Sequence, residues 1–448
     1  MTLATLILAA GQGTRMKSTL AKVLHSVGGV PMVTRAVNTA WDLALQPPVV
    51  VVGQDAAAVQ SALGDRAQYV FQRELRGTGH AVQQAKEALI GRSDLVIVYY
   101  ADMPLLQAET LRRLVDAQTA SNAAFTLLTA TVPDPRGFGR VVRVDGVIRE
   151  IVEERAASEL QKHIRELNVG VYCFRADWLW EHIGQLAPNP QTDEIFITDL
   201  LMLAIAGGER VETVETFEFD EIIGVNTRVH LSEAEVALRR RICRKWQLAG
   251  VTISDPATTY IEERVQIGID TLIEPNTHLR GETVIGTNCI IGPNSIIEDA
   301  KIGDCCTITG SVVESAILEN DVQVGPFAHL RTGAYLERGV HIGNFGEVKN
   351  SRLGRDTRMG HFSYIGDAEI GADVNIGCGT ITANFDGETK HKTVIGDGAF
   401  IGSDTILRAP VTVGANARTG AGAVVTHDVA AGQTVVGVPA RPIVKKQE

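Results

Sequence analysis

A six-residue repeat in the second half of the chain restricts the fold more than any other feature of the sequence. Aliphatic residues, with one threonine among them, recur at this spacing in two series: Val324, Leu330, Leu336, Ile342 and Val348, then Ile395, Ile401, Leu407, Val413, Thr419 and Val425. Many of them precede a glycine. One repeat cannot bury its apolar side chain alone, so neighbouring repeats have to stack and share a core. The pattern predicts a parallel β-helix in which three repeats make one triangular coil.

The first half of the chain has a different rhythm. From Leu3 to about Thr227, short aliphatic runs such as TLILAA, PVVVVG and LVIVYYAD alternate with helical patterns, which predicts a mostly parallel α/β sheet. The polar segment that follows carries apolar residues at helical spacing and ends at Gly250, so its arginines are interpreted as a solvated helix face. We expect a sheet domain at 1–226, a linker helix at 227–250 and the β-helix at 251–448.

Composition excludes several classes of protein. The 448 residues are 45% hydrophobic and 21% charged, without an apolar run of membrane-spanning length, so we expect no membrane insertion. The apolar opening segment is interpreted as a buried strand and not as a signal peptide. Six scattered cysteines without a CxxC pair suit reduced thiols, hence a cytoplasmic location. A net charge of −11 argues against a nucleic-acid partner, so any phosphate site has to be a local basic cluster.

The motif LAAGQGTRM, residues 8–16, directly follows the first predicted strand. Gly11 and Gly13 let the backbone turn tightly, so that amide groups can face a phosphate with no side chain between them. Arg15 and Lys22 add fixed positive charge nearby. Turn chemistry alone would also explain a single glycine-rich loop, but the arginine and lysine at these offsets favour a nucleotide site.

At this motif the sequence resembles the sugar-1-phosphate nucleotidyltransferases. Later matches narrow the resemblance to the bacterial bifunctional N-acetylglucosamine-1-phosphate uridylyltransferase/glucosamine-1-phosphate N-acetyltransferase family, over essentially the whole chain. The resemblance implies a Rossmann-like uridylyltransferase domain followed by a left-handed β-helix acetyltransferase domain. It also implies acetylation of glucosamine 1-phosphate by acetyl-CoA, then transfer of UMP from UTP to N-acetylglucosamine 1-phosphate. The resemblance further implies Mg²⁺ as cofactor, a homotrimeric assembly, and a role in supplying UDP-N-acetylglucosamine for cell-wall synthesis.

By this resemblance the first half has three groups of site residues. The nucleotide would contact Leu8, Ala9, Ala10, Gly11, Lys22, Gln72, Gly77 and Thr78, with Arg15 and Lys22 as catalytic cations. The sugar would contact Gly139, Glu153, Asn168 and Asn226, and Mg²⁺ would be held by Asp102 and Asn226. Asp102 could otherwise be a helix-capping aspartate. The chain departs from the family at Ala21, Ala101 and Arg155.

The second half carries an unusual basic cluster and a break in the repeat at Thr382–Lys392, which predicts an excursion loop. Acetylation needs a base for the amine, and His361 is the candidate because imidazole titrates near neutral pH. A buried structural histidine is the alternative. By the resemblance, the acceptor sugar phosphate would contact Arg331, Lys349, Tyr364, Asn375 and Lys390. Acetyl-CoA would contact Cys378, Asn384, Phe385, Ser403 and Ala421.

Other interpretations of the second half remain at this stage. Cys378 is interpreted as a small apolar residue and not as a nucleophile, and the histidines of the repeats are not interpreted as a zinc site. Gly437 stands where the family often has an arginine for the coenzyme phosphates, a role that would pass to Arg441 or Arg418. Two alternative proteins remain: a monofunctional nucleotidyltransferase with a regulatory or assembly β-helix, and a trimeric scaffold without activity.

Overall fold

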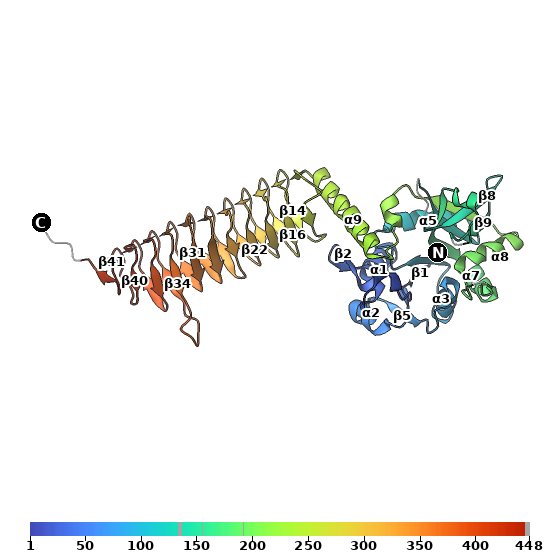
Figure 1. Cartoon of the computed structure of the whole chain (residues 1–448), viewed down its shortest axis with the longest axis horizontal. Coiled ribbons are helices and arrows are strands. Elements are labelled where there is room, and N and C mark those ends of the chain that lie inside the picture. Colours follow the sequence, from blue (N-terminus) through green and yellow to red (C-terminus); the bar gives the residue numbers. More distant parts are fainter. Residues whose placement is uncertain (133–136, 155, 191, 444–448) are drawn as a thin grey trace. The chain divides into compact units, whose positions relative to one another are not determined.

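The computed structural model describes residues 1–443 except 133–136, 155 and 191. Arg155, one of the departures from the family, therefore lies outside the described residues. The chain divides into two compact units, Met1–Leu238 and Arg239–Glu448. Helix α9 (Arg228–Leu248) crosses the boundary between them and occupies most of the segment expected to be a linker helix (Figure 1). No helix in the described ranges combines the length and the apolar character needed to cross a bilayer.

The first unit is built on a nine-stranded sheet with the order β11-β7-β10-β6-β1-β4-β5, to which β8 and β9 are attached. The strands are β1 (Leu3–Leu8), β4 (Val49–Val52), β5 (Gln68–Phe71), β6 (Leu95–Tyr100), β7 (Phe125–Thr131), β8 (Gly139–Val144), β9 (Val147–Val152), β10 (Glu166–Arg175) and β11 (Val211–Glu215). Strand β1 is parallel to β4 and β6, whereas β10 runs antiparallel to β6 and β7. The sheet is therefore mixed, with one long antiparallel strand in an otherwise mostly parallel centre.

Helices cover both faces of this sheet. Alternate residues of β1 enter different cores: Leu6 and Leu8 belong to one hydrophobic cluster, Ile7 to the other. The first cluster receives residues of α3 (Thr78–Gln84), α7 (Ala176–His182) and α8 (Leu200–Ala206), and the second receives residues of α1 (Met32–Leu43), α2 (Ala56–Leu63) and α5 (Ala108–Ser121). Because strands of such a sheet are buried on both sides, they read as continuous aliphatic runs in the sequence. Two shorter helices are α4 (Lys86–Leu89) and α6 (Glu159–Lys162).

The second unit is a stack of short parallel strands in three sheets (Figure 1). Sheet I runs from β12 (Thr252–Ile253) to β42 (Arg441–Pro442), sheet II from β13 (Tyr260–Ile261) to β40 (Val424–Val425), and sheet III from β14 (Gln266–Ile267) to β38 (Val411–Val413). Strand β42 pairs antiparallel with β41 (Thr434–Val436) at the end of sheet I. Every residue of the two six-residue series is buried, with 3% or less of its surface exposed. The predicted fold class, a Rossmann-like domain followed by a left-handed parallel β-helix, is confirmed.

The coils are not uniform in length. The register pairs His329 with Glu347 in one coil but Tyr364 with Ile381 in another, so coils of 18 and 17 residues both occur. The register then pairs Ile381 with Ile406, 25 residues later. The extra residues form the loop between β34 (Ile381–Ala383) and β35 (Thr393–Ile395), which projects from the stack at the predicted break in the repeat (Figure 1).

Candidate active sites

A cavity of about 310 Å³ lies in the first unit, where β1 and β6 end side by side. Its lining consists of Leu8, Ala9, Ala10, Gly11, Lys22, Val23, Gln72, Leu75, Gly77, Thr78, Ala81, Tyr100, Asp102, Glu194 and Phe196. All eight residues expected to contact the nucleotide are in this lining, together with Asp102. The carboxyl ends of strands in such sheets are the usual place for ligands. Sequence reasoning missed Glu194 and Phe196, because their segment follows α7 without any motif.

The glycine-rich loop opens one side of this cavity. Gly13 has a φ of 63°, and a side chain there would collide with the stem of Lys22, so this glycine gives Lys22 its path to the cavity. A Cβ added at Gly11 would meet no atom within 4 Å, which leaves the backbone at this point accessible to a ligand. Arg15 lies exposed on the short helix η1 (Thr14–Met16) and does not line the cavity.

Lys22 joins the two residues expected to bind metal. Its ammonium forms an ion pair with the Asp102 carboxylate and donates a hydrogen bond of 3.1 Å to Asn226 Oδ1. The backbone N–H of Val225 donates to the carbonyl of Asp102 at 2.8 Å, which brings Asn226 next to Asp102 although 124 positions separate them in the chain. Two side-chain oxygens thus face one cation. A hard cation with few protein ligands, such as Mg²⁺, fits this donor set.

The segment expected to contact uracil is fixed by backbone contacts. The Gln72 amide is buried, and its Nε2 donates to the Gly77 carbonyl at 3.1 Å. Gly77 has a φ of 95°, and a Cβ there would lie 2.5 Å from the carbonyl oxygen of Ile195. The same carbonyl accepts a hydrogen bond from Gly79 N–H at 2.8 Å. Glycine at position 77 is therefore required by both its conformation and the close approach of Ile195.

Three of the residues expected to hold the sugar come together: Gly139 on β8, Glu153 directly after β9, and Asn168 on β10. Gly139 opposes Asn168 in the β8–β10 register, and a Cβ at Gly139 would lie 3.7 Å from Glu153 Oε1. Asn168 donates to the Tyr172 hydroxyl at 2.7 Å and accepts from Gly170 N–H at 3.1 Å. Burial raises the pKa of Glu153, and the Asp199 and Glu194 carboxylates raise it further.

Tyr100 connects this group with Asp102. Its ring packs on Gly170, where an added Cβ would lie 2.5 Å from a ring carbon. The pKa of the Tyr100 hydroxyl is raised by burial first, then by the Glu153 and Asp102 carboxylates. The phenol is neutral at physiological pH, and both carboxylates lie close enough to affect its pKa. Asn226, which was assigned to both groups, lies on the Asp102 side.

In the second unit, four of the five residues expected to bind the acceptor meet along sheet II. Arg331 follows β25 (His329–Leu330), Lys349 ends β28 (Gly346–Lys349), and Tyr364 lies in β31 (Ser363–Gly366). Lys390 reaches them from the excursion loop. The pKa of Lys349 is lowered by the positive charge of Lys390 first and of Arg331 second, so three cations converge. Arg331 also pairs with Glu347 at 2.8 Å. A site with this excess of positive charge suits a phosphate.

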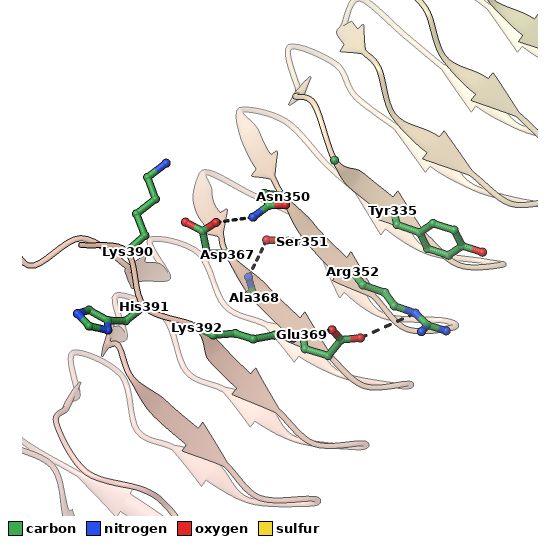
Figure 2. Close-up of a pocket in the computed structure, with 11 residues that line it drawn as sticks. Tyr335, Asn350, Ser351, Arg352, Asp367, Ala368, Glu369, Lys390, His391 and Lys392 are labelled. Carbon is green, nitrogen blue, oxygen red and sulfur yellow. Dashed lines mark hydrogen bonds and ion pairs between the residues drawn. The ribbon is translucent and has the colours of Figure 1, made fainter. Parts of the chain in front are cut away.

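Asp367, which the sequence did not single out, links the excursion loop to this cluster. Its carboxylate accepts hydrogen bonds from the Asn350 amide at 2.6 Å and from the Asn384 amide at 2.5 Å. A Cβ at Gly366 would lie 2.8 Å from Asn384 Nδ2, so the glycine leaves room for that amide. Figure 2 shows Asp367 beside Lys390 at a cavity of about 440 Å³ that continues across sheet III toward Arg352 and Glu369. Phe385 is exposed on the loop.

The residues expected to act on acetyl-CoA stack in the turns between sheets I and II. His361, Cys378, Ser403 and Ala421 occupy these turns in successive coils, joined by hydrogen bonds such as Asp404 N–H to Cys378 carbonyl at 2.6 Å. His361 is exposed in the single chain, and its Nδ1 lies 3.3 Å from Asn344 Oδ1, so it is not part of the β-helix core. The described ranges contain no group of three His, Cys, Asp or Glu residues that could hold a metal.

Asn375 is the exception among the acceptor-binding residues. It lies exposed on β33 (Asn375–Ile376) in sheet I, paired with Arg358 and Phe400, whereas the cationic cluster follows sheet II. One chain therefore does not bring Asn375 together with Lys349 and Lys390. The thiol of Cys378 is free and exposed.

Comparisons with known proteins cover both units. Family models match residues 5–167, as MobA-like NTP transferase domain, and residues 264–299 and 392–427, as bacterial transferase hexapeptide (six repeats). The bifunctional protein GlmU of Geobacillus sp. (strain WCH70) is 48% identical over 424 residues, 94% of this chain and 92% of that protein. GlmU of Heliobacterium modesticaldum is 46% identical over 431 residues, 96% of this chain and 94% of that protein. Among solved structures, a putative glucose-1-phosphate thymidylyltransferase from Bacillus anthracis is 21% identical with a TM-score of 0.44, over 52% of this chain and 94% of that chain.

Proposed function

The chain belongs to the bifunctional GlmU family, and on that premise we propose which unit performs each of the two transfer reactions. It acetylates glucosamine 1-phosphate with acetyl-CoA, then transfers UMP from UTP to N-acetylglucosamine 1-phosphate, giving UDP-N-acetylglucosamine and pyrophosphate. Uridylyl transfer belongs to the first unit and acetyl transfer to the second. The observation that carries the first assignment is the cavity that gathers all eight expected nucleotide contacts.

Uridylyl transfer requires positioning more than covalent chemistry from the protein. The sugar phosphate is already an anionic nucleophile, so its oxygen attacks the α-phosphorus of UTP without a general base while the bond to the β-phosphate oxygen breaks. Gln72 and Gly77 hold the uracil, and Glu153 and Asn168 hold the acetylated sugar. Lys22 and Arg15 stabilise the departing pyrophosphate. Arg15 is exposed and outside the cavity lining, so it has to move inward on binding.

Asp102 and Asn226 are the residues that would hold Mg²⁺, since their side-chain oxygens already face a common cation. When bound, the metal neutralises phosphate charge on both reactants. Every other contact in the site comes from the chain itself. Tyr100 lies near the Asp102 and Glu153 carboxylates as a neutral phenol and adds no charge to the site.

Acetyl transfer requires a proton acceptor. Arg331, Lys349 and Lys390 hold the phosphate of glucosamine 1-phosphate. The amine nitrogen attacks the thioester carbonyl carbon, the new C–N bond forms, and the C–S bond breaks to release coenzyme A. His361 takes the proton that the amine loses, and its exposure in the turn leaves both the acceptor and the coenzyme able to reach it.

A homotrimer would complete this site. Asn375 lies on a different sheet from the cationic cluster, so a second chain has to bring its own Asn375 to it. The turns that carry His361 also expose three phenylalanines, Phe327, Phe345 and Phe362, of which the first two stack at 5.4 Å. An exposed apolar row of this kind supports association of parallel β-helices. Free thiols at all six cysteines support a cytoplasmic location for these reactions.

Mixing two inactive variants tests the shared site. We expect His361→Ala and Asn375→Ala chains to be deficient in acetyl transfer when separate. Reassembled together in equal amounts, they should recover about a quarter of wild-type activity, because that share of sites would combine two intact residues from different chains. Light scattering should report a trimer. A monomer, or a mixture no more active than its components, would contradict the shared site.

A further inference from the structure

We propose that the Lys22 ammonium acts as a built-in counter-ion for Asp102 and Asn226, so that a divalent cation enters this site only together with nucleotide phosphates. The proposal rests on the proposed metal-binding role of these two residues. It adds a role for Lys22 in the nucleotide-free enzyme, before any charge on pyrophosphate has to be stabilised. Lys22 would then determine when the metal binds, in addition to what it contacts during the reaction.

The geometry carries the proposal. Lys22 Nζ contacts both expected metal ligands at once: the Asp102 carboxylate through an ion pair, and Asn226 Oδ1 at 3.1 Å. Only 11% of the Lys22 side chain and 18% of the Asp102 side chain are exposed. The ammonium therefore occupies the position toward which both oxygens point. A metal ion that took these two oxygens as ligands would have to displace it.

Close packing of Gly13 restricts where the Lys22 side chain can begin. A Cβ at Gly13 would overlap the Cβ of Lys22, so the loop and the lysine stem are in close contact. The backbone at Lys22 begins the short helix η2 (Lys22–Leu24), which sets where the side chain starts. The Lys22 side chain also lines the nucleotide cavity, so a nucleotide phosphate bound there would lie beside its ammonium. In the proposed exchange, the ammonium would leave the Asp102 carboxylate for this phosphate by a movement of the side chain.

Charge decides which exchange is favourable. One ammonium beside one carboxylate is a neutral pair, whereas a divalent cation added next to a displaced ammonium leaves uncompensated positive charge in a partly buried site. The phosphates of a nucleotide in the same cavity remove this excess, because they accept the ammonium and contribute oxygens to the metal. Binding of metal and of nucleotide should therefore be strongly coupled, and each should bind weakly without the other.

Binding of Mn²⁺ to the full-length chain without nucleotide tests the inference, with no turnover involved. In equilibrium dialysis, Lys22→Met should bind Mn²⁺ at least about tenfold more tightly than wild type. The variant keeps the side-chain length and removes the competing charge. The gain should disappear in the Lys22→Met/Asp102→Asn double variant. Lys17→Met is the matched control, because it removes an exposed cation from the same loop without contact to Asp102.

The outcomes separate the inference from the proposed metal site. Equal Mn²⁺ affinity in wild type and Lys22→Met, or an equal gain in Lys17→Met, would overturn the counter-ion role. Loss of Mn²⁺–UTP binding in Asp102→Asn, followed by water-proton relaxation, supports the metal site independently, and its retention would reject that site. Lys22→Gln provides a second variant if Lys22→Met unfolds, and acetyl transfer by the same chain reports that the protein remains assembled.

Discussion

Replacement of Gly77 by alanine gives a prediction whose size follows from the structure. Gly77 has a φ of 95° and a ψ of 179°, a conformation that almost only glycine adopts, so alanine costs about 1–3 kcal/mol there. Its Cβ would also lie 2.5 Å from the Ile195 carbonyl oxygen and 2.8 Å from the Ile195 nitrogen, both of which are backbone atoms. Ile195 is held by hydrogen bonds to Gly79 and Arg76, so it cannot shift freely. The clash of the added Cβ with these fixed atoms increases the destabilisation by about 1–3 kcal/mol.

Gly91→Ala is the matched control. Gly91 also has a positive φ, 70°, but an added Cβ would meet no atom within 4 Å. We expect Gly91→Ala to lower the free energy of unfolding of the first unit by about 1–2 kcal/mol, and Gly77→Ala by about 2–6 kcal/mol. Urea unfolding followed by tryptophan fluorescence measures both, since three of the four tryptophans, at 41, 178 and 180, lie in the first unit.

The same pair of variants separates stability from binding. Gly77→Ala should raise the KM for UTP at least about tenfold, because a shift of the Gln72–Gly77 contact displaces the residues expected to hold uracil. Gly91→Ala should leave this KM unchanged, and neither variant should alter acetyl transfer. Equal stability and equal KM in the two alanine variants would refute the close-approach argument.

Three further predictions concern the two sites. Asp102→Asn should nearly abolish uridylyl transfer and leave acetyl transfer intact, as measured by separate assays on one preparation; wild-type uridylyl rates would remove Asp102 from the mechanism. His361→Ala should lower acetyl transfer by about 10²-fold to 10⁴-fold without affecting uridylyl transfer, whereas an unchanged pH–rate profile would place the base elsewhere. The positive charge of Lys390 lowers the pKa of Lys349, so Lys349 loses its charge at a lower pH than an ordinary lysine does. The KM for glucosamine 1-phosphate should therefore begin to rise below the pKa of an ordinary lysine. Lys390→Met should move this rise to higher pH, and an unmoved profile would disprove the coupling.

Periodicity made most of the fold predictable. Aliphatic residues at every sixth position have only one way to be buried together, and each of them is in the β-helix core. Two features were not predictable from a local pattern. Strand β10 reads like any other buried strand, so nothing in its composition marks it as antiparallel. The second feature is the shorter coils of 17 residues. They lose a residue from a turn and keep their inward positions apolar, so the apolar pattern does not mark them.

The sites were predictable where a motif marks a strand end and not where distant segments meet. Gly11 and Asp102 follow β1 and β6, and parallel neighbours end at the same edge. Glu194 and Phe196 reach the cavity from an irregular segment, and Asp367 acts through amides 17 positions away on either side. Contacts of this kind depend on the assembled coils, so a sequence without an alignment gives no sign of them. The position of Asn375 on sheet I likewise became evident only from the register.

A single reaction tests the central claim that one chain carries both transfers. The full-length protein is supplied with glucosamine 1-phosphate, isotopically labelled acetyl-CoA, UTP and Mg²⁺, and the products are identified by mass spectrometry. The account predicts UDP-N-acetylglucosamine that carries the labelled acetyl group, together with free coenzyme A and pyrophosphate. Uridylyl transfer only to added N-acetylglucosamine 1-phosphate, with no label incorporated, would contradict it and leave the β-helix without catalytic activity.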